Sequence, residues 1–164
     1  MRRPGFFVIA GAAVIAALTI TVCVFLPPRL VIAETDSGRI FWQKNIHRGD
    51  EFAVEFIHSV NQTPVRDTFR IEGRNIAPVS TLFYNFGAGM QTDLSEGQQL
   101  TRRGGALVIS GFTQTFNELN FIVGTVSDHT FFFGDEKISL RDLCGRNAHI
   151  TFRVKRIIWF MREN

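Results

Sequence analysis

Apolar and polar residues alternate along most of the chain after residue 29. The clearest case is residues 51–60, EFAVEFIHSV, in which Phe52, Val54 and Phe56 fall on every second position. Successive side chains of a strand point to opposite faces, so this pattern predicts a strand with one buried face. Residues 65–72, VRDTFRIE, alternate in the same way after a short polar run. We therefore predict a hairpin that pairs residues 51–60 with residues 65–72.

Other short segments of this kind are separated by turns that carry glycine. They are residues 30–34, 39–43, 76–84, 106–112, 120–126, 129–133, 137–140 and 149–157. About nine or ten strands at this density predict an all-β domain, either an antiparallel β-sandwich or a small barrel. Pro78 indicates that its strand lies at an edge or is broken there. Residues 139–146, SLRDLCGR, are compatible with one helical turn.

The first 29 residues follow a different pattern. An apolar run of 21 residues extends from Phe6 to Leu26, between two arginines and two prolines. As a helix it would span about 32 Å, against about 30 Å of bilayer hydrocarbon. We predict an uncleaved transmembrane anchor over residues 1–29, with a cleaved signal peptide as the alternative. Arg2 and Arg3 would hold the N-terminus in the cytoplasm, so residues 30–164 would form an exported domain beside the inner membrane, in the periplasm.

The charge and the cysteine content of the exported domain bear on its possible partners and on what stabilises it. Arg2, Arg3 and Arg29 account for the whole formal charge of +3, so the exported domain is formally neutral. This neutrality gives no support for a nucleic-acid partner, and we predict none. Cys144 is the one cysteine of that domain, so its stability must come from a hydrophobic core rather than a disulfide. The locally basic tail, residues 153–164, could contact lipid headgroups or form a solvated strand end.

The predicted hairpin carries an unusual group of polar residues, His58, Ser59, Arg66 and Asp67. His58 and Asp67 fall on the phenylalanine-bearing faces, where a carboxylate must be hydrogen-bonded. In one interpretation, Asp67 accepts bonds from His58 and from turn amides and stabilises the hairpin. In the other, the four residues form a ligand- or partner-binding site. His58 and Ser59 point to opposite sides of a strand, which argues against a base and nucleophile pair.

A second unusual segment is FGAGM, in which Gly87 and Gly89 flank one alanine. Such spacing allows backbone amides to point into a concavity that an anion could occupy, although an ordinary turn is the alternative. With Arg66, these glycines suggest a small-ligand or anion-binding module. The four histidines show no metal-binding spacing, so we predict neither a metal nor a cofactor.

The segment GDEFAVEFIHSVNQTPVRDTFRI, followed by FGAGM, resembles the bacterial domain of unknown function DUF1850. The resemblance covers roughly residues 30–125 and rests on the Gly-Asp start, His58-Ser59, Pro64-Val65 and the glycine pair. The family usually carries glutamate in place of Asp67. Its members are small exported or membrane-anchored proteins, often encoded beside TAXI-type TRAP transporters, and no activity is established for them.

The resemblance implies a membrane-anchored periplasmic accessory or interaction protein. Its partners would be the inner membrane and TRAP-type transporter subunits or a solute-binding protein. An enzyme is the less favoured class, and its most concrete form is a hydrolase that uses His58 and Asp67.

Overall fold

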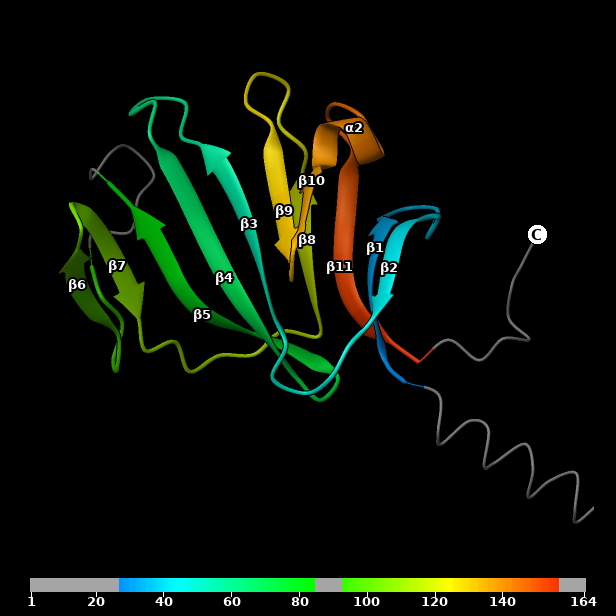
Figure 1. The fold of residues 1–164 in the computed structure, drawn as a ribbon, viewed down its shortest axis with the longest axis horizontal. Helices are drawn as coiled ribbons and strands as arrows, with labels where there is room; N and C mark the ends of the chain where they lie inside the picture. The colour runs from blue at the N-terminus through cyan, green and yellow to red at the C-terminus, as the bar shows by residue number, and fades with distance from the viewer. Residues whose placement is uncertain (1–26, 85–92, 157–164) are drawn as a thin grey trace, which may run out of the picture.

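The computed structural model of the protein describes residues 27–84 and 93–156. Most of these residues lie in two antiparallel sheets, which confirms the predicted β class (Figure 1). Neither sheet closes on itself, so the domain is not a barrel. The predicted membrane anchor lies outside the described residues. Among the residues that are described, no helix is long and apolar enough to cross a membrane.

The smaller sheet, here sheet A, has the strand order β2-β1-β11-β8. Its strands are β1 (Arg29–Glu34), β2 (Ile40–Asn45), β8 (Glu118–Ile122) and β11 (His149–Lys155). Arg29, the first residue of β1, lies opposite Lys155, the last residue of β11. The described domain therefore begins and ends at one end of sheet A, which we call the proximal end. The opposite end is the distal end.

The larger sheet, sheet B, has the strand order β10-β9-β3-β4-β5-β7-β6. Its strands are β3 (Glu51–Ile57), β4 (Pro64–Glu72), β5 (Asn75–Phe83), β6 (Gln99–Arg103), β7 (Ala106–Ser110), β9 (His129–Phe133) and β10 (Glu136–Ser139). One helical turn, α2 (Leu140–Cys144), follows β10 at the distal end, in the segment where the sequence predicts it (Figure 1). Ser139 caps this turn by accepting the N–H of Asp142 at 3.0 Å.

The hairpin of β3 and β4 confirms the central prediction from the sequence. Its register runs from Glu51 opposite Arg70 to Ile57 opposite Pro64. Strand β6 was not predicted, because all five of its residues are exposed and it therefore lacks the apolar alternation of a half-buried strand.

Strand β5 is irregular around Pro78, as predicted. The register between β4 and β5 shifts beside Phe69, which lies opposite Pro78. On its other side, β5 pairs with β7 from Ser80 onward, and its one further pairing among the described residues is a bridge between Ile76 and Phe116. Proline has no N–H to donate, so a gap in the ladder at this point costs little.

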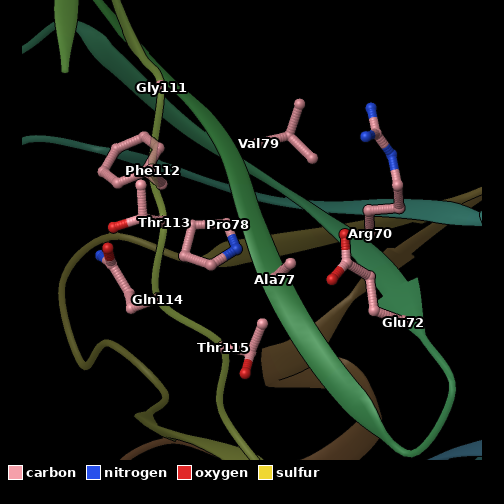
Figure 2. A pocket seen from close by; sticks show the side chains of 10 residues that line it. All are labelled: Arg70, Glu72, Ala77, Pro78, Val79, Gly111, Phe112, Thr113, Gln114 and Thr115. Carbon is pink, nitrogen blue, oxygen red and sulfur yellow. The ribbon is translucent and has the colours of Figure 1, made fainter. Parts of the chain in front are cut away.

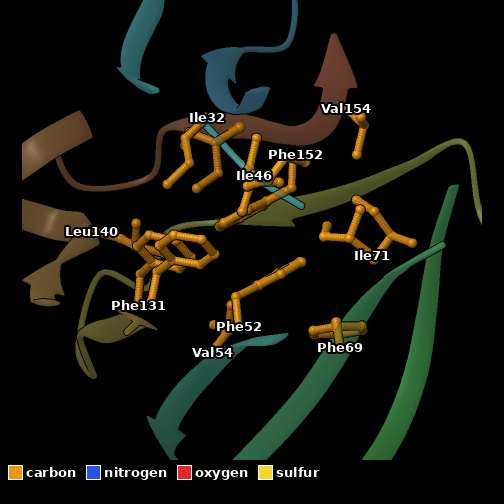
Figure 3. Packing of buried hydrophobic residues seen from close by; sticks show 14 of the residues in the cluster. Ile32, Ile46, Phe52, Val54, Phe69, Ile71, Phe131, Leu140, Phe152 and Val154 are labelled. Carbon is orange, nitrogen blue, oxygen red and sulfur yellow. The ribbon is translucent and has the colours of Figure 1, made fainter. Parts of the chain in front are cut away.

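Phenylalanine rings dominate the core between the two sheets (Figure 3). Phe52 of β3 stacks on Phe152 of β11, with ring centroids 5.6 Å apart. Phe131 of β9 packs against both rings, at 6.0 Å and 5.5 Å. Burial of each such side chain contributes about 1.5–3 kcal/mol. Hydrophobic burial thus joins the sheets, and Cys144 is a free thiol.

A second, smaller apolar cluster lies on the part of sheet B that extends beyond sheet A in Figure 1. Its buried members are Val65, Phe83, Leu107 and Ile109. Val65 and Phe69 occupy the same face of β4, but Phe69 belongs to the main core. Asp67 stands between them on that face, so it marks the boundary between the two clusters.

Candidate functional site

The four polar residues of the hairpin do not meet at one site. Arg66 lies opposite Glu55, and Asp67 lies opposite Val54, well inside the paired strands. His58 and Ser59 lie beyond the end of β3, in the turn that leads to β4. The prediction that His58 or Ser59 lies close to Arg66 and Asp67 is therefore wrong.

His58 organises the turn rather than bonding to Asp67. Its Nδ1 accepts the N–H groups of Val60 at 3.2 Å and Asn61 at 3.3 Å. Its own N–H donates to the carbonyl of Thr63 at 2.9 Å. The turn amides that were expected to donate to Asp67 thus donate to His58 instead. The interpretation in which Asp67 accepts a hydrogen bond from His58 is therefore wrong. A hydrolase that uses this pair has no support from their placement.

Ser59 is exposed at the tip of the same turn. Its carbonyl accepts the side-chain amide of Gln62 at 2.5 Å. Its hydroxyl forms no hydrogen bond with any residue of the described ranges. Gln62 adopts a φ of 51°, the left-handed conformation that tight turns use.

Arg66 lies on the outer face of sheet B, away from the core. Its guanidinium carbon is 4.3 Å from the centroid of the Phe132 ring, and its Nη1 is 3.7 Å from Glu55 Oε2. Stacking on the ring and a long ion pair account for its position on the surface. Gly87 and Gly89, predicted to act with Arg66, lie outside the described residues.

Asp67 lies on the inner face of sheet B and meets a residue of the next strand. Thr81 of β5 lies opposite it and donates its hydroxyl to Asp67 Oδ1 at 2.6 Å. Burial raises the pKa of Asp67 above its usual value, and the bond from Thr81 lowers it by less. Oδ2 forms no hydrogen bond in the described part of the chain. The result is a carboxyl group with a raised pKa and with one oxygen that no described residue bonds.

The expectation that Asp67 would be hydrogen-bonded is therefore confirmed, with a different donor. Thr81 was not predicted as a partner of Asp67, although a hydroxyl two positions before the buried Phe83 places a polar group on an apolar face. That alternation was the available signal.

A second polar cluster, centred on Asp128, lies at the distal end. Asp128 Oδ2 accepts the hydroxyl of Ser139 at 2.6 Å, and its Oδ1 accepts the N–H of Arg141 at 3.1 Å. Arg141 Nη2 donates to the carbonyls of Gly124 at 3.3 Å and Val126 at 3.0 Å. These bonds attach the loop between β8 and β9, residues 123–128, to the start of α2.

His129 and Gly124 complete this cluster. His129 Nδ1 accepts the N–H of Gly124 at 3.1 Å, and its ring lies 5.1 Å from that of Phe56. Burial lowers the pKa of His129; nearby Asp128 opposes this shift and Arg141 adds to it. A neutral imidazole with an accepting Nδ1 is therefore the stable form. Within the described ranges, no group of three or more His, Cys, Asp or Glu side chains could hold a metal ion.

Exposed apolar side chains accompany these bonded loops. Val60, in the β3–β4 turn, is 65% exposed, and Val126, in the β8–β9 loop, is 91% exposed. Ile57, at the end of β3, is 41% exposed, and its N–H donates to Ser127 Oγ at 3.0 Å. The two loops are thus neighbours at the distal end, and we call Ile57, Val60 and Val126 the distal apolar tips.

A hollow of about 320 Å³ opens beside β5 around Pro78 (Figure 2). It exists because residues 111–115 leave the edge of β5 between its pairing with β7 and the Ile76–Phe116 bridge. Its lining consists of Arg70, Glu72, Ala77, Pro78, Val79, Gly111, Phe112, Thr113, Gln114 and Thr115. The charged residues come from β4 and the hydroxyl and amide groups from the segment opposite (Figure 2). Arg70 also donates two hydrogen bonds to Glu51 Oε1, at 2.9 Å and 2.7 Å.

Comparison with known proteins identifies a family but no relative. The family model described as domain of unknown function DUF1850 matches residues 52–140, more than half of the chain. No curated protein and no solved structure matches the chain. The match begins later than the resemblance seen in the motifs and continues past residue 125, through the bond between Asp128 and Ser139. It therefore includes the hairpin turn and both loops of the distal end, and the chain belongs to the DUF1850 family.

Proposed function

We propose that this protein is a membrane-anchored periplasmic accessory protein whose distal end binds a partner protein. The apolar run in the sequence ends three residues before Arg29, where β1 begins. A linker of that length keeps the proximal end at the membrane surface and directs the distal end away from it. Tethering raises the effective concentration of the domain for a neighbour in the same membrane.

The distal apolar tips carry this proposal. Three exposed apolar side chains lie on two neighbouring segments, and specific hydrogen bonds hold both segments. The His58 bonds fix the turn that carries Val60, and Arg141 fixes the loop that carries Val126. A preorganised apolar surface loses little conformational entropy on binding, which favours association.

The partner follows from the family resemblance described above. We propose a subunit of a TRAP-type transporter or its solute-binding protein, both of which would lie within reach of a tethered periplasmic domain. The molecular event at the interface would be binding.

Site-specific photo-crosslinking tests this function in native membranes. A photoreactive residue at Val126 should capture a transporter subunit or the solute-binding protein, identified by mass spectrometry. The matched control is Leu94, which is 44% exposed on a different loop. Val126→Asp should weaken co-purification of the same component, and Leu94→Asp should not. Failure to recover any transporter component from Val126 would overturn the proposed partner.

The hollow beside β5 favours a second candidate, the binding of a small organic acid. Its volume falls at the lower limit for ligand pockets, and it is lined by Arg70, which also bonds Glu51, and by three polar side chains from the segment opposite. A thermal-shift screen with organic acids should then find at least one that raises the melting temperature. Arg70→Gln should abolish that shift, whereas Arg102→Gln, on exposed β6, should preserve it. A screen in which no acid stabilises the protein would exclude this candidate.

A further inference from the structure

Three cationic residues lie in the proximal half of sheet A. Arg29 and Lys155 are direct cross-strand partners on β1 and β11. Arg153 lies two residues before Lys155 and therefore projects from the same face of β11. That face is the outer one, because Val154 between them belongs to the core. We call Arg29, Arg153 and Lys155 the proximal cations.

None of the proximal cations forms an ion pair within the described residues. Arg29 Nε donates to Asn45 Oδ1 at 3.0 Å, which is a neutral acceptor. Arg153 lies opposite Glu118 in the β8–β11 register, yet the two side chains form no ion pair, and Arg153 Nε is buried without a hydrogen-bond partner. Burial and the neighbouring charge of Arg153 both lower the pKa of Lys155.

Two strand cations elsewhere in the described residues are paired with carboxylates. Lys44 lies 2.6 Å from Glu136, and Arg70 lies 2.7 Å from Glu51. At the proximal end, like charges are close together and lack a counter-ion from the described chain. An anion supplied from outside would relieve this repulsion.

The position of the cluster identifies the kind of anion. The apolar run ends at Leu26, three residues before Arg29, and extended chain of that length covers about 10 Å. The headgroup layer on each side of a bilayer is about 5–7 Å thick. With the run in the membrane, Arg29 and its cross-strand partner Lys155 would lie at or just above the lipid phosphates. The guanidinium of Arg153 extends from them toward the β1–β2 turn, where a Cβ on Gly38 would lie 3.7 Å from its Nη2.

We propose that Arg29 and Lys155, together with the nearby charge of Arg153, form a binding surface for anionic phospholipid headgroups, which fixes the orientation of sheet A on the bilayer. The proposal rests on the membrane anchor of the proposed function. It assigns the proximal end to lipid and leaves the distal apolar tips to a protein partner. Cations near an anionic surface each gain about 1 kcal/mol, which favours one orientation of a tethered domain.

Lysine acylation of the full-length protein in nanodiscs tests the proposal. The chain has three lysines, Lys44, Lys137 and Lys155, so mass spectrometry resolves each of them. Lys155 should react about fivefold more slowly in discs with anionic lipid than in zwitterionic discs, as expected from one cation held at the surface. Lys137 lies on β10 of the other sheet and should react equally in both.

Substitutions then test whether the proximal cations cause the protection of Lys155 from acylation. Arg29→Gln and Arg153→Gln, made singly and together, should reduce the protection of Lys155. The double variant Arg102→Gln with Arg103→Gln removes two charges from exposed β6 and should leave it unchanged. Arg29→Gln alters only the first residue of a strand, so it remains informative even if Arg153→Gln impairs folding.

Two results would overturn the lipid assignment. One is equal reactivity of Lys155 in both kinds of disc, and the other is full protection by inorganic phosphate in zwitterionic discs. Loss of the anchor would give a different result, because the protein would fail to co-elute with discs of either composition. The experiment therefore distinguishes failure of this proposal from failure of the anchor.

Discussion

Asp67 and Thr81 form a side-chain pair across β4 and β5, with Thr81 Oγ1 2.6 Å from Asp67 Oδ1. The pair lies at the boundary between the main core and the smaller cluster of sheet B. Burial favours the protonated form of the Asp67 carboxyl, so ionisation of this group lowers the free energy of unfolding. Two consequences of this environment can be measured.

The first is a pH dependence of folding. The pKa of Asp67 is raised in the folded state above its usual 3.8, so between these values the folded protein binds more protons than the unfolded one. Its contribution to stability is therefore present at low pH and is lost as pH rises through the folded pKa. Denaturant melts of wild type and Asp67→Asn at pH 4 and pH 7 should show wild type losing stability relative to the variant at the higher pH. A constant difference between them would contradict the raised pKa.

The second is the loss caused by removing the donor. Thr81→Val leaves the partly buried carboxyl without its hydrogen bond, and such losses typically cost about 1–3 kcal/mol. Thr81→Ser keeps the hydroxyl and should be milder. Ser80→Ala, the neighbouring position on the opposite face of β5, provides the control in the same denaturant melts. Equal stability of Thr81→Val and Ser80→Ala would show that the bond contributes nothing.

His58 should prove structural. His58→Ala removes the acceptor for two turn amides and should cost about 1 kcal/mol. His58→Asn offers a shorter acceptor of the kind that turns use and should recover part of this loss. Ser59→Ala should change stability by less than about 0.5 kcal/mol, because its hydroxyl is exposed. Hydrogen exchange at the amides of Val60 and Asn61 reports on the turn directly, and unchanged protection in His58→Ala would argue against this role.

Gly124 should tolerate no side chain. A Cβ at this position would lie 2.0 Å from the carbonyl oxygen of Ser127, closer than atoms can approach. Gly124→Ala should therefore destabilise by about 1–3 kcal/mol and loosen the loop that carries Val126. Gly73→Ala is the comparison, since its Cβ would meet nothing within 4 Å and only its φ of 69° opposes the change. Calorimetric unfolding of both variants would contradict the steric argument if Gly73→Ala were the more destabilised.

Cys144 should be an unreactive thiol. Burial raises its pKa from 9.0 to about 11, which lowers the thiolate fraction at pH 8 about a hundredfold. Alkylation of Cys144, followed by peptide mass spectrometry, should accelerate by about that factor when the domain is unfolded in denaturant. Rapid alkylation in the native protein would show that the thiol is accessible and ionised.

The sequence predicted those features that depend on one face of one strand. The β3–β4 hairpin was visible because both strands are half-buried, and period two also placed Arg66 and Asp67 on opposite faces. Strand β6 was invisible because no residue in it is buried. A pattern of apolar residues indicates buried positions. A strand that is held only by backbone hydrogen bonds to its neighbour therefore cannot be recognised from such a pattern.

The site required information that alternation does not contain. Alternation assigns His58 and Asp67 to the phenylalanine-bearing faces of the two strands. However, β3 ends at Ile57, so His58 lies in the turn and does not contact Asp67. Thr81 reaches Asp67 from a third strand, and Asp128 joins Ser139 across a hairpin. Such contacts depend on strand order and register, which are set by packing of the whole domain rather than by any local segment.

The place of β1 in sheet A determines how the domain would resist mechanical force. β1 lies between β2 and β11 and pairs with both along its length. A pull on the chain ahead of Arg29, against a partner held at the distal end, would act along β1. Because ladder hydrogen bonds lie across the strand, such a force loads them together in shear rather than opening them one at a time. The strand next to the predicted tether is thus the one best placed to carry tension without unravelling the fold.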